Sequence, residues 1–383
     1  MRGTKAPQAS MICLVSPESR IPERHPLRAV KQLVDAALKD LAPVFEGMYS
    51  NIGRPSIPPE SLLKATLLMA LFSVRSDRMF CDQLDYNLLF RWFLDMDMTE
   101  DAFHPTTFTK NRERLMDHDV AREFFALVVG QAKAAGLMSS EHFSVDGTLI
   151  EAWASLKSFK RRDEPVEEKP PVEEKPLVEE KPSVEEKPSV EDAKNPTVDF
   201  HGETRGNETH ASTTDPEARL ARKGNGKEAK LSYAQHVLME NRNGLIVDMC
   251  ITHAHGRAEV EAAYMMLERN DPTRSRRTVA ADKGYDTRDF VEGCRRIGVT
   301  PHVAMNKARS GGSAIDGRTS RHEGYQLSQR FRKRIEEVFG WEKTVANYRK
   351  TRFRGKQRNE MASLLIGAAY NLLRMAKLLL PLA

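Results

Sequence analysis

Two hydrophobic patterns divide the chain. From residue 27 to residue 137, large apolar residues recur at helical spacing, with dense runs at residues 62–72 and 88–93. Spacing of this kind gives each helix one apolar face and predicts an all-α domain. Beyond residue 138, short alternating apolar segments are interleaved with amphipathic ones, which predicts an α/β domain over residues 138–383.

The expected α/β domain opens with a strand in HFSVDGTLIEAWA, where apolar and polar residues alternate. Two β-rich runs, Leu231–Met239 and Leu245–Thr252, then flank the turn sequence ENRNG and predict a hairpin. The remaining pattern predicts a helix over 257–269, a strand in RTVAADKGYD, a helix over Thr287–Ile297, a strand in VTPHVAM and a basic amphipathic helix over Ser328–Lys343. This order predicts a mixed sheet flanked by helices.

The helical domain ends in a basic segment, HPTTFTKNRERL, in which Thr106 or Thr107 can cap a helix. Several short helices followed by a basic one are typical of a helix-turn-helix-like DNA-binding module. A plain helical bundle with a charged surface remains the alternative. The cations that this last helix would present are Lys110, Arg112 and Arg114.

The formal net charge of +5 hides a strong asymmetry. A repeat of the type PVEEKP occupies residues 165–192, where regular prolines and few apolar residues predict a disordered insertion into the α/β domain. Residues 164–192 carry a net charge of −7, whereas Lys307–Arg358 carries +10. A stretch as basic as Lys307–Arg358 suits a polyanion, and nucleic acid is the expected partner. The alternative is a solvated helix face with a basic loop.

The rest of the composition narrows the class of protein. The four cysteines form no close pair, so neither a zinc knuckle nor a disulfide scaffold is indicated, and reduced thiols in a cytosolic protein are expected. Residues 1–26 read as an N-terminal extension without a signal peptide. The C-terminal segment from Met361 is long enough to span a membrane, but its polar residues and helical spacing predict a core helix instead, and no membrane contact is expected.

Three carboxylates occupy informative positions in the α/β domain. Asp146 lies within an apolar strand, Asp282 follows the apolar run TVAA, and Glu336 lies on the basic helix. A buried aspartate is costly unless it is paired or binds a metal. Carboxylates that converge from strands and a helix can hold Mg²⁺ through oxygen ligands, and two such ions can clamp the attacking and leaving oxygens of a phosphodiester.

At these residues the chain resembles bacterial insertion-sequence transposases of the DDE class, of the insertion-sequence-five type. The resemblance covers nearly the whole chain except the repeat. The matching segments are RIPERHPLRAVKQLVD, GRPSIPPESLLKATLL, FHPTTFTKNRERL, FSVDGTLIEAWAS, HGETRGNETHASTTDPEARLARKGNGKEAKLSY, ADKGYDT and RKRIEEVFGW. The resemblance implies a ribonuclease H-like fold for the α/β domain, with Asp146, Asp282 and Glu336 as a metal-binding catalytic triad.

The third carboxylate has a neighbour, Glu337, and the resemblance distinguishes the two. Related transposases share Tyr, two residues, Arg, three residues, Glu, six residues and Lys on this helix. Arg332, Glu336 and Lys343 fit that spacing, whereas Gln329 replaces the tyrosine. The pattern implies that Arg332 and Lys343 reach DNA phosphates, with ordinary surface charge as the alternative. A basic loop that includes Arg219 is also expected to contact DNA.

The resemblance implies a DNA transposase that binds the terminal inverted repeats of its own element. It would cut DNA with two Mg²⁺ ions, for which Mn²⁺ can substitute, and join the 3′-hydroxyl ends to target DNA. It would act in the bacterial cytoplasm at the nucleoid, as a dimer or higher assembly on DNA. Two alternatives stay open: a non-catalytic DNA-binding relic or repressor, and a nuclease without strand transfer.

Overall fold

The computed structural model describes residues 16–379, apart from residues 50–51, 53–54, 163–198, 201–202, 225 and 271–275. The expected PVEEKP insertion lies outside the described residues. The described residues before the first strand form the helices α1 (Pro17–Arg20), α2 (Leu27–Asp40), α3 (Ala42–Met48), α4 (Pro59–Leu71), α5 (Asp77–Tyr86), α6 (Leu88–Phe93), α7 (Pro105–Asp117) and α8 (Val120–Ala134).

The described end of the expected N-terminal extension packs against the helical region. Ser16 caps α1, and the carboxylate of Glu18 accepts hydrogen bonds from Arg28 at the start of α2 and from the indole of Trp92 in α6. Residues 16–26 are therefore part of the helical region as the structure describes it, whereas residues 1–15 lie outside the description.

A mixed sheet forms the centre of the second region, as the alternating pattern predicts. Its strands lie in the order β10-β9-β1-β7-β6, and β8 also pairs with β7. Strands β10, β9 and β1 run parallel to one another, while β7 runs antiparallel to β1, β6 and β8. The bounds are β1 (His142–Glu151), β6 (Arg219–Ala221), β7 (Lys230–Glu240), β8 (Ile246–His253), β9 (Arg277–Ala281) and β10 (Val299–Val303).

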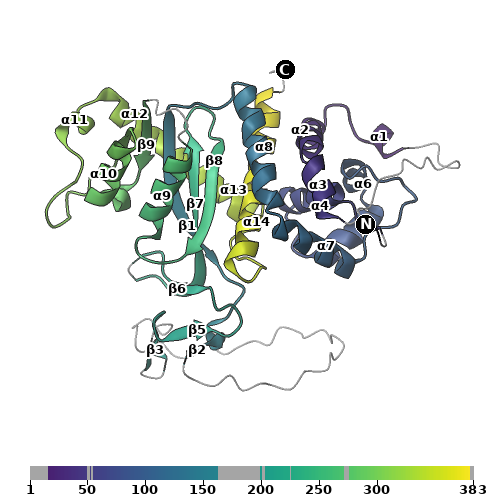
Figure 1. The fold of residues 1–383 in the computed structure, drawn as a ribbon, viewed down its shortest axis with the longest axis horizontal. Coiled ribbons are helices and arrows are strands. Elements are labelled where there is room, and N and C mark those ends of the chain that lie inside the picture. Colours follow the sequence, from purple (N-terminus) through teal and green to yellow (C-terminus); the bar gives the residue numbers. More distant parts are fainter. Residues whose placement is uncertain are drawn as a thin grey trace.

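Helices cover both faces of this sheet (Figure 1). Phe143 and Val145 of β1 point to one face, where they pack against α9 (Ala258–Arg269) and α10 (Arg288–Arg296). Ile150 points to the other face and joins the core formed with α13 (Ile335–Thr344) and α14 (Lys356–Leu379). The mixed sheet flanked by helices fits the ribonuclease H-like fold that the resemblance implies.

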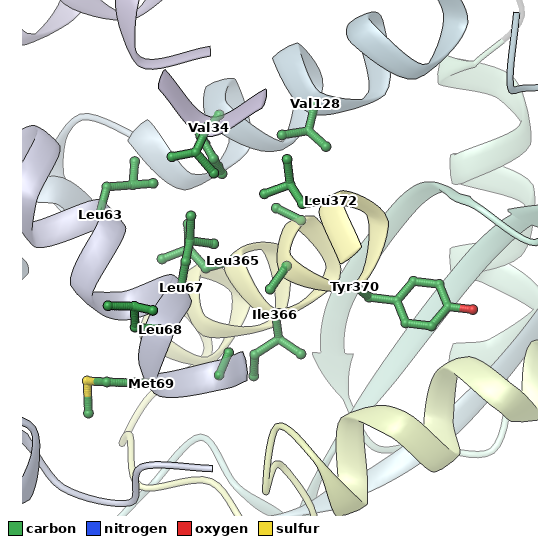
Figure 2. Close-up of a cluster of buried hydrophobic side chains, with 14 of the residues drawn as sticks. Val34, Leu63, Leu67, Leu68, Met69, Val128, Leu365, Ile366, Tyr370 and Leu372 are labelled. Atoms are coloured by element: carbon green, nitrogen blue, oxygen red, sulfur yellow. The ribbon is translucent and has the colours of Figure 1, made fainter. Parts of the chain in front are cut away.

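Helix α14 joins the sheet to the helical region. Its apolar side chains belong to one hydrophobic core together with those of α2, α4, α8 and β8, and Figure 2 shows Leu365, Ile366 and Leu372 beside Leu67 and Val128. By length and composition α14 could cross a membrane, but 72% of its most apolar window is buried within the protein. It is therefore the core helix that the sequence predicts, and the core crosses the expected domain boundary at residue 137.

One expected helix is divided in two. The residues from 328 to 343 belong to α12 (Glu323–Phe331), a 3-10 turn η3 (Arg332–Arg334) and α13, rather than to one continuous helix. The two arginines of this turn have different partners. Arg334 donates to the backbone oxygens of Asn241 and Arg242 at 3.2 and 3.1 Å, whereas Arg332 donates to the side-chain oxygen of Gln329. A short helix α11 (Gly317–Ser320) precedes α12.

Two short ribbons lie apart from the main sheet, at the lower edge of Figure 1. Strands β2 (Phe159–Arg161) and β5 (His210–Ser212) pair antiparallel, as do β3 (Asp199–Phe200) and β4 (Glu203–Thr204), and the turn η1 (Leu156–Ser158) precedes β2. The segment that contains the repeat is thus connected to these ribbons and not to a strand of the main sheet.

Candidate functional site

The register of two parallel strands brings Asp146 and Asp282 together. Strand β1 pairs with β9 over His142–Ser144, with Ser144 opposite Ala280. Each aspartate lies two residues beyond this last pair, so the two occupy equivalent positions where the strands separate. Both are half-buried and locally fixed: the Oδ1 of Asp146 accepts from the Gly147 N–H at 2.8 Å, and the Oδ1 of Asp282 accepts from the Gly284 N–H at 2.7 Å.

Glu336 is the third carboxylate of the expected metal-binding set, and it is carried by a helix rather than a strand. It lies in the first turn of α13, where its side chain is exposed. Burial raises the pKa of Asp146 to about 6; the negative charges of Asp282 and Glu336 also raise it, while the Gly147 N–H and Arg332 lower it. Asp282 and Glu336 are therefore both close enough to Asp146 to act on it electrostatically, as neighbouring like charges do.

The donor set is appropriate for a hard divalent cation. Carboxylate oxygens are the ligands that Mg²⁺ prefers, and a cation would offset the mutual repulsion that these three acids experience. In the described part of the chain, no three His, Cys, Asp or Glu side chains are arranged closely enough to hold a metal ion together. The carboxylates are neighbours, and the exposed Glu336 is the one with most freedom to move.

Gln329, at the position where the family resemblance implies a tyrosine, supports Arg332. Its amide donates to the backbone oxygen of His302 on β10, and its side-chain oxygen accepts from the Nε of Arg332 at 3.1 Å. Arg332 is half-buried and lowers the pKa of Asp146. Gln329 therefore holds Arg332 by one hydrogen bond, and the held guanidinium is within electrostatic reach of Asp146.

Lys343 lies beside the same strand. Its ammonium donates to the hydroxyl of Thr148, two residues after Asp146 and on the same face of β1. Burial lowers the pKa of Lys343, as does the positive charge of Lys223 and, more weakly, that of Arg349, while Glu342 and Asp146 oppose them. Cations that crowd together in this way favour an anionic partner, and they adjoin the candidate metal site.

The basic residues of α7 separate into two groups. Lys110 and Arg114 are exposed one helical turn apart, and Arg114 also stacks over the ring of Tyr49 at 5.2 Å. Arg112 is only 4% exposed and forms an ion pair with Asp77 at 2.6 Å. Its burial does not support the expected contact with DNA, because the guanidinium is already occupied inside the helical region.

Arg219 lies at the start of β6, half-buried, where its guanidinium donates to the backbone oxygens of Pro216 and Ala218 at 2.6 and 3.2 Å. Nearby Asp215 is buried and accepts from the hydroxyl of Tyr233 at 2.7 Å and from the Gly355 N–H at 3.2 Å. This loop is thereby held against the segment that leads into α14, close to the strands that carry the site.

Two further residues lie at the site: Glu259, which no sequence pattern selects, and Tyr285, whose place three residues after Asp282 suggests either packing beside the metal site or a role in the turn. Glu259, on α9, lies against Gly147, and burial, Asp146 and Asp282 together raise its pKa to about 6. Tyr285 follows Asp282 in the turn η2 (Lys283–Tyr285) and is buried. Glu259 stands in no motif with a recognisable spacing and reaches the site only through the packing of α9 on the sheet, whereas Tyr285 lies in the segment ADKGYDT that contains Asp282.

Comparison with known proteins gives two family matches. Residues 15–114 match a family described as a transposase domain (DUF772), and residues 202–372 match the transposase DDE domain. The second range includes Asp282 and Glu336, while Asp146 lies outside both. The chain therefore carries two transposase domains, of which the second is of the DDE type.

Comparisons with curated proteins and with solved structures do not extend this assignment. No curated protein matches the chain significantly. Among solved structures, the piggyBac transposase synaptic complex with hairpin DNA is 11% identical, with 91% of this chain and 73% of that chain covered. The TM-score of 0.37 is too low for an argument about fold or partners.

Proposed function

We propose that this transposase belongs to an insertion sequence of the insertion-sequence-five type, binds the terminal inverted repeats of that element, and performs metal-dependent DNA cleavage and strand transfer. The observation that supports this most directly is the register of β1 and β9, which places Asp146 and Asp282 side by side with Glu336 within electrostatic reach. A group of carboxylates is a suitable ligand set for divalent cations such as Mg²⁺, which prefer oxygen ligands.

Asp146, Asp282 and Glu336 would hold the metal, and Mn²⁺ can replace Mg²⁺ because both accept oxygen ligands. When bound, a pair of such ions stabilises the attacking and leaving oxygens of a phosphodiester during in-line displacement. The chain itself positions the DNA. Lys343 and Arg332 flank the carboxylates and would bind backbone phosphates on either side of the reacting one.

Two other basic surfaces are proposed to contact the DNA. Lys110 and Arg114 are exposed on α7 and would contribute to recognition of the element's ends, and Arg219 would support the loop beside Lys223. Because a transposition event joins two ends, we propose a dimer or higher assembly on DNA, which sedimentation of the protein with and without a DNA end would measure.

The test uses a labelled DNA end from the element, with Mg²⁺ or with EDTA. We expect cleavage in Mg²⁺ and none in EDTA, and we expect Asp146→Asn to abolish cleavage while the protein still binds the end. Asp289→Asn is the matched control, since Asp289 is an exposed acid of α10 paired with Arg257 at 2.8 Å.

Other results would point to the alternatives. Binding by the wild type without cleavage, even in Mn²⁺, would contradict the enzymatic proposal and favour a DNA-binding relic or repressor. Metal-dependent cleavage without joining of the 3′-hydroxyl end to a target duplex would favour a nuclease. Equal cleavage by the wild type and Asp146→Asn would remove Asp146 from the catalytic set.

A further inference from the structure

Glu259 lies against the backbone of the candidate metal site. It is in the first turn of α9, which packs on β1 and β7, and its side chain extends over Gly147, the residue after Asp146. A methyl group added at Gly147 would be 3.0 Å from the Cγ of Glu259 and 3.1 Å from its Oε1. The carboxylate of Glu259 is therefore within van der Waals reach of the strand at the point where Asp146 is attached.

The contacts of Glu259 differ from those of its neighbour on the helix. Glu261 approaches the side chains of His255 at 3.6 Å and Arg257 at 3.7 Å. Glu259 forms no hydrogen bond or ion pair with any residue that the structure describes. The charges that act on it are those of Asp146 and Asp282, which are acids as well. A carboxylate within electrostatic reach of two others without a cation is unfavourable, so this position suits a bound cation.

A second, independent feature points to the same place. The hydroxyl of Tyr285 belongs to a side chain that is 1% exposed, and it has no hydrogen-bond partner among the described residues. Burial raises the pKa of Tyr285, and so do the charges of Glu259, Asp146 and Asp282. A buried phenol normally has a partner. Here the phenol is a donor within the field of three carboxylates, where a metal-bound water or a ligating carboxylate would accept its proton in a hydrogen bond.

We propose that Glu259 is a fourth carboxylate of the metal-binding site, together with Asp146, Asp282 and Glu336. The inference rests on the proposed function and extends its ligand set. Charge balance supports it: two divalent cations carry four positive charges, whereas Asp146, Asp282 and Glu336 supply three negative ones. Glu259 supplies the fourth, and Gly147 allows its approach because a side chain there would displace it.

The proposal is tested by measuring Mn²⁺ binding to the full-length protein in the absence of DNA. Electron paramagnetic resonance and isothermal titration calorimetry report the number of bound ions and their affinities. We expect the wild type to bind two ions. Glu259→Gln should weaken one of them roughly 10- to 100-fold, the range found when metal-site residues beyond the main ligands are removed. Glu261→Gln is the matched control on the same helix and should bind as the wild type does.

Gly147→Ala tests the contact itself. We expect it to weaken Mn²⁺ binding in the wild-type background and to have little further effect in Glu259→Gln, because both changes act through the same side chain. Circular dichroism melts of all variants establish that they are folded. Full additivity of the two changes would overturn the assigned role of Gly147.

Asp146→Asn separates failure of this inference from failure of the proposed function. If Asp146→Asn loses Mn²⁺ binding while Glu259→Gln retains wild-type stoichiometry and affinity, Glu259 is not a ligand and the inference is overturned, with the proposed function intact. If the wild type binds no Mn²⁺, or if Asp146→Asn binds it unchanged, the proposed metal site and the inference both fail.

Discussion

Replacement of Arg112 by alanine should impair stability without weakening DNA binding. Arg112 joins the helical region to the loop before α14: it pairs with Asp77 at the start of α5, stacks on Phe108 within its own helix α7, and stacks on Phe353 in that loop. Arg352 from the same loop pairs with Asp77 at 2.9 Å. Arg112 is thus part of a buried network, and its removal disturbs packing and charge at once.

The expected loss of stability depends on the partners that the Asp77 carboxylate keeps when Arg112 is removed. Removing one partner of a buried ion pair typically costs about 3–5 kcal/mol, because the other charge is left uncompensated. In Arg112→Ala the Asp77 carboxylate keeps Arg352 and the hydroxyl of Thr109, which donates at 2.7 Å. We therefore expect a loss at or somewhat below the lower limit, roughly 2–3 kcal/mol in the free energy of unfolding, a part of it from lost stacking.

This loss should depend on pH. Burial raises the pKa of Asp77, but Arg112 and Arg352 outweigh it, so that the folded-state pKa lies below the ordinary value. A carboxylate with a depressed pKa contributes stability above its unfolded pKa of about 3.9, and the contribution is lost as the pH falls through the folded value. The difference between wild type and Arg112→Ala should therefore be full at pH 7 and shrink in the acid range below about pH 4.

Urea unfolding and salt-dependent DNA binding distinguish the two roles. Arg112→Ala should lower the urea midpoint and leave the slope of log K against log salt concentration unchanged. Lys110→Ala and Arg114→Ala should leave the urea midpoint unchanged. Each should reduce the salt slope by about 0.9 if the residue contacts a phosphate of duplex DNA. An Arg112→Ala protein of wild-type stability with a reduced salt slope would refute the structural role.

Two further predictions concern stability. Burial raises the pKa of Glu342 to about 8, so the folded state keeps a proton that the unfolded state releases near pH 4.5. Wild-type stability should fall as the pH rises from about 5 to about 8, by up to about 1.4 kcal/mol per pH unit, and Glu342→Gln should flatten that dependence in urea titrations; equal slopes would contradict this. Deletion of residues 165–192 should leave the melting temperature nearly unchanged in calorimetry, because loop closure costs only about 0.6 kcal/mol per doubling of length; a large drop would contradict this.

Much of the sheet could be predicted from local patterns. The hairpin of β7 and β8 follows from two apolar runs around ENRNG, and β9 and β10 follow from the short runs TVAA and VTPHV. Such runs are bounded by turn residues, so their positions are set within a few neighbours along the chain. Asp146 and Asp282 could be selected because each interrupts or ends an apolar strand, which is a local and costly feature.

Other features depend on contacts that are distant in sequence. The basic residues of α7 look equivalent in NRER, yet Arg112 is buried because Asp77 and Phe353 meet it from elsewhere in the chain. The break at Arg332–Arg334 divides a sequence that has uninterrupted helical periodicity, and its partners lie on the β7–β8 hairpin. Periodicity reports which face is apolar, but it does not report what that face meets.

The arrangement of β1 and α13 connects the metal site to the DNA-binding cations. Along β1, Asp146 and Thr148 face the same side, separated by about 6.6 Å of strand rise. Along α13, Glu336 and Lys343 are seven residues apart, about 10.5 Å of helix and close to two full turns, so they share a face as well. The hydrogen bond from Lys343 to Thr148 fixes one end of this contact, and Glu336, on the same helix, is within electrostatic reach of Asp146. A single helix packed on a single strand thus sets the spacing between the carboxylates and the nearest cation, and a shift of either element would disturb metal binding and DNA positioning together.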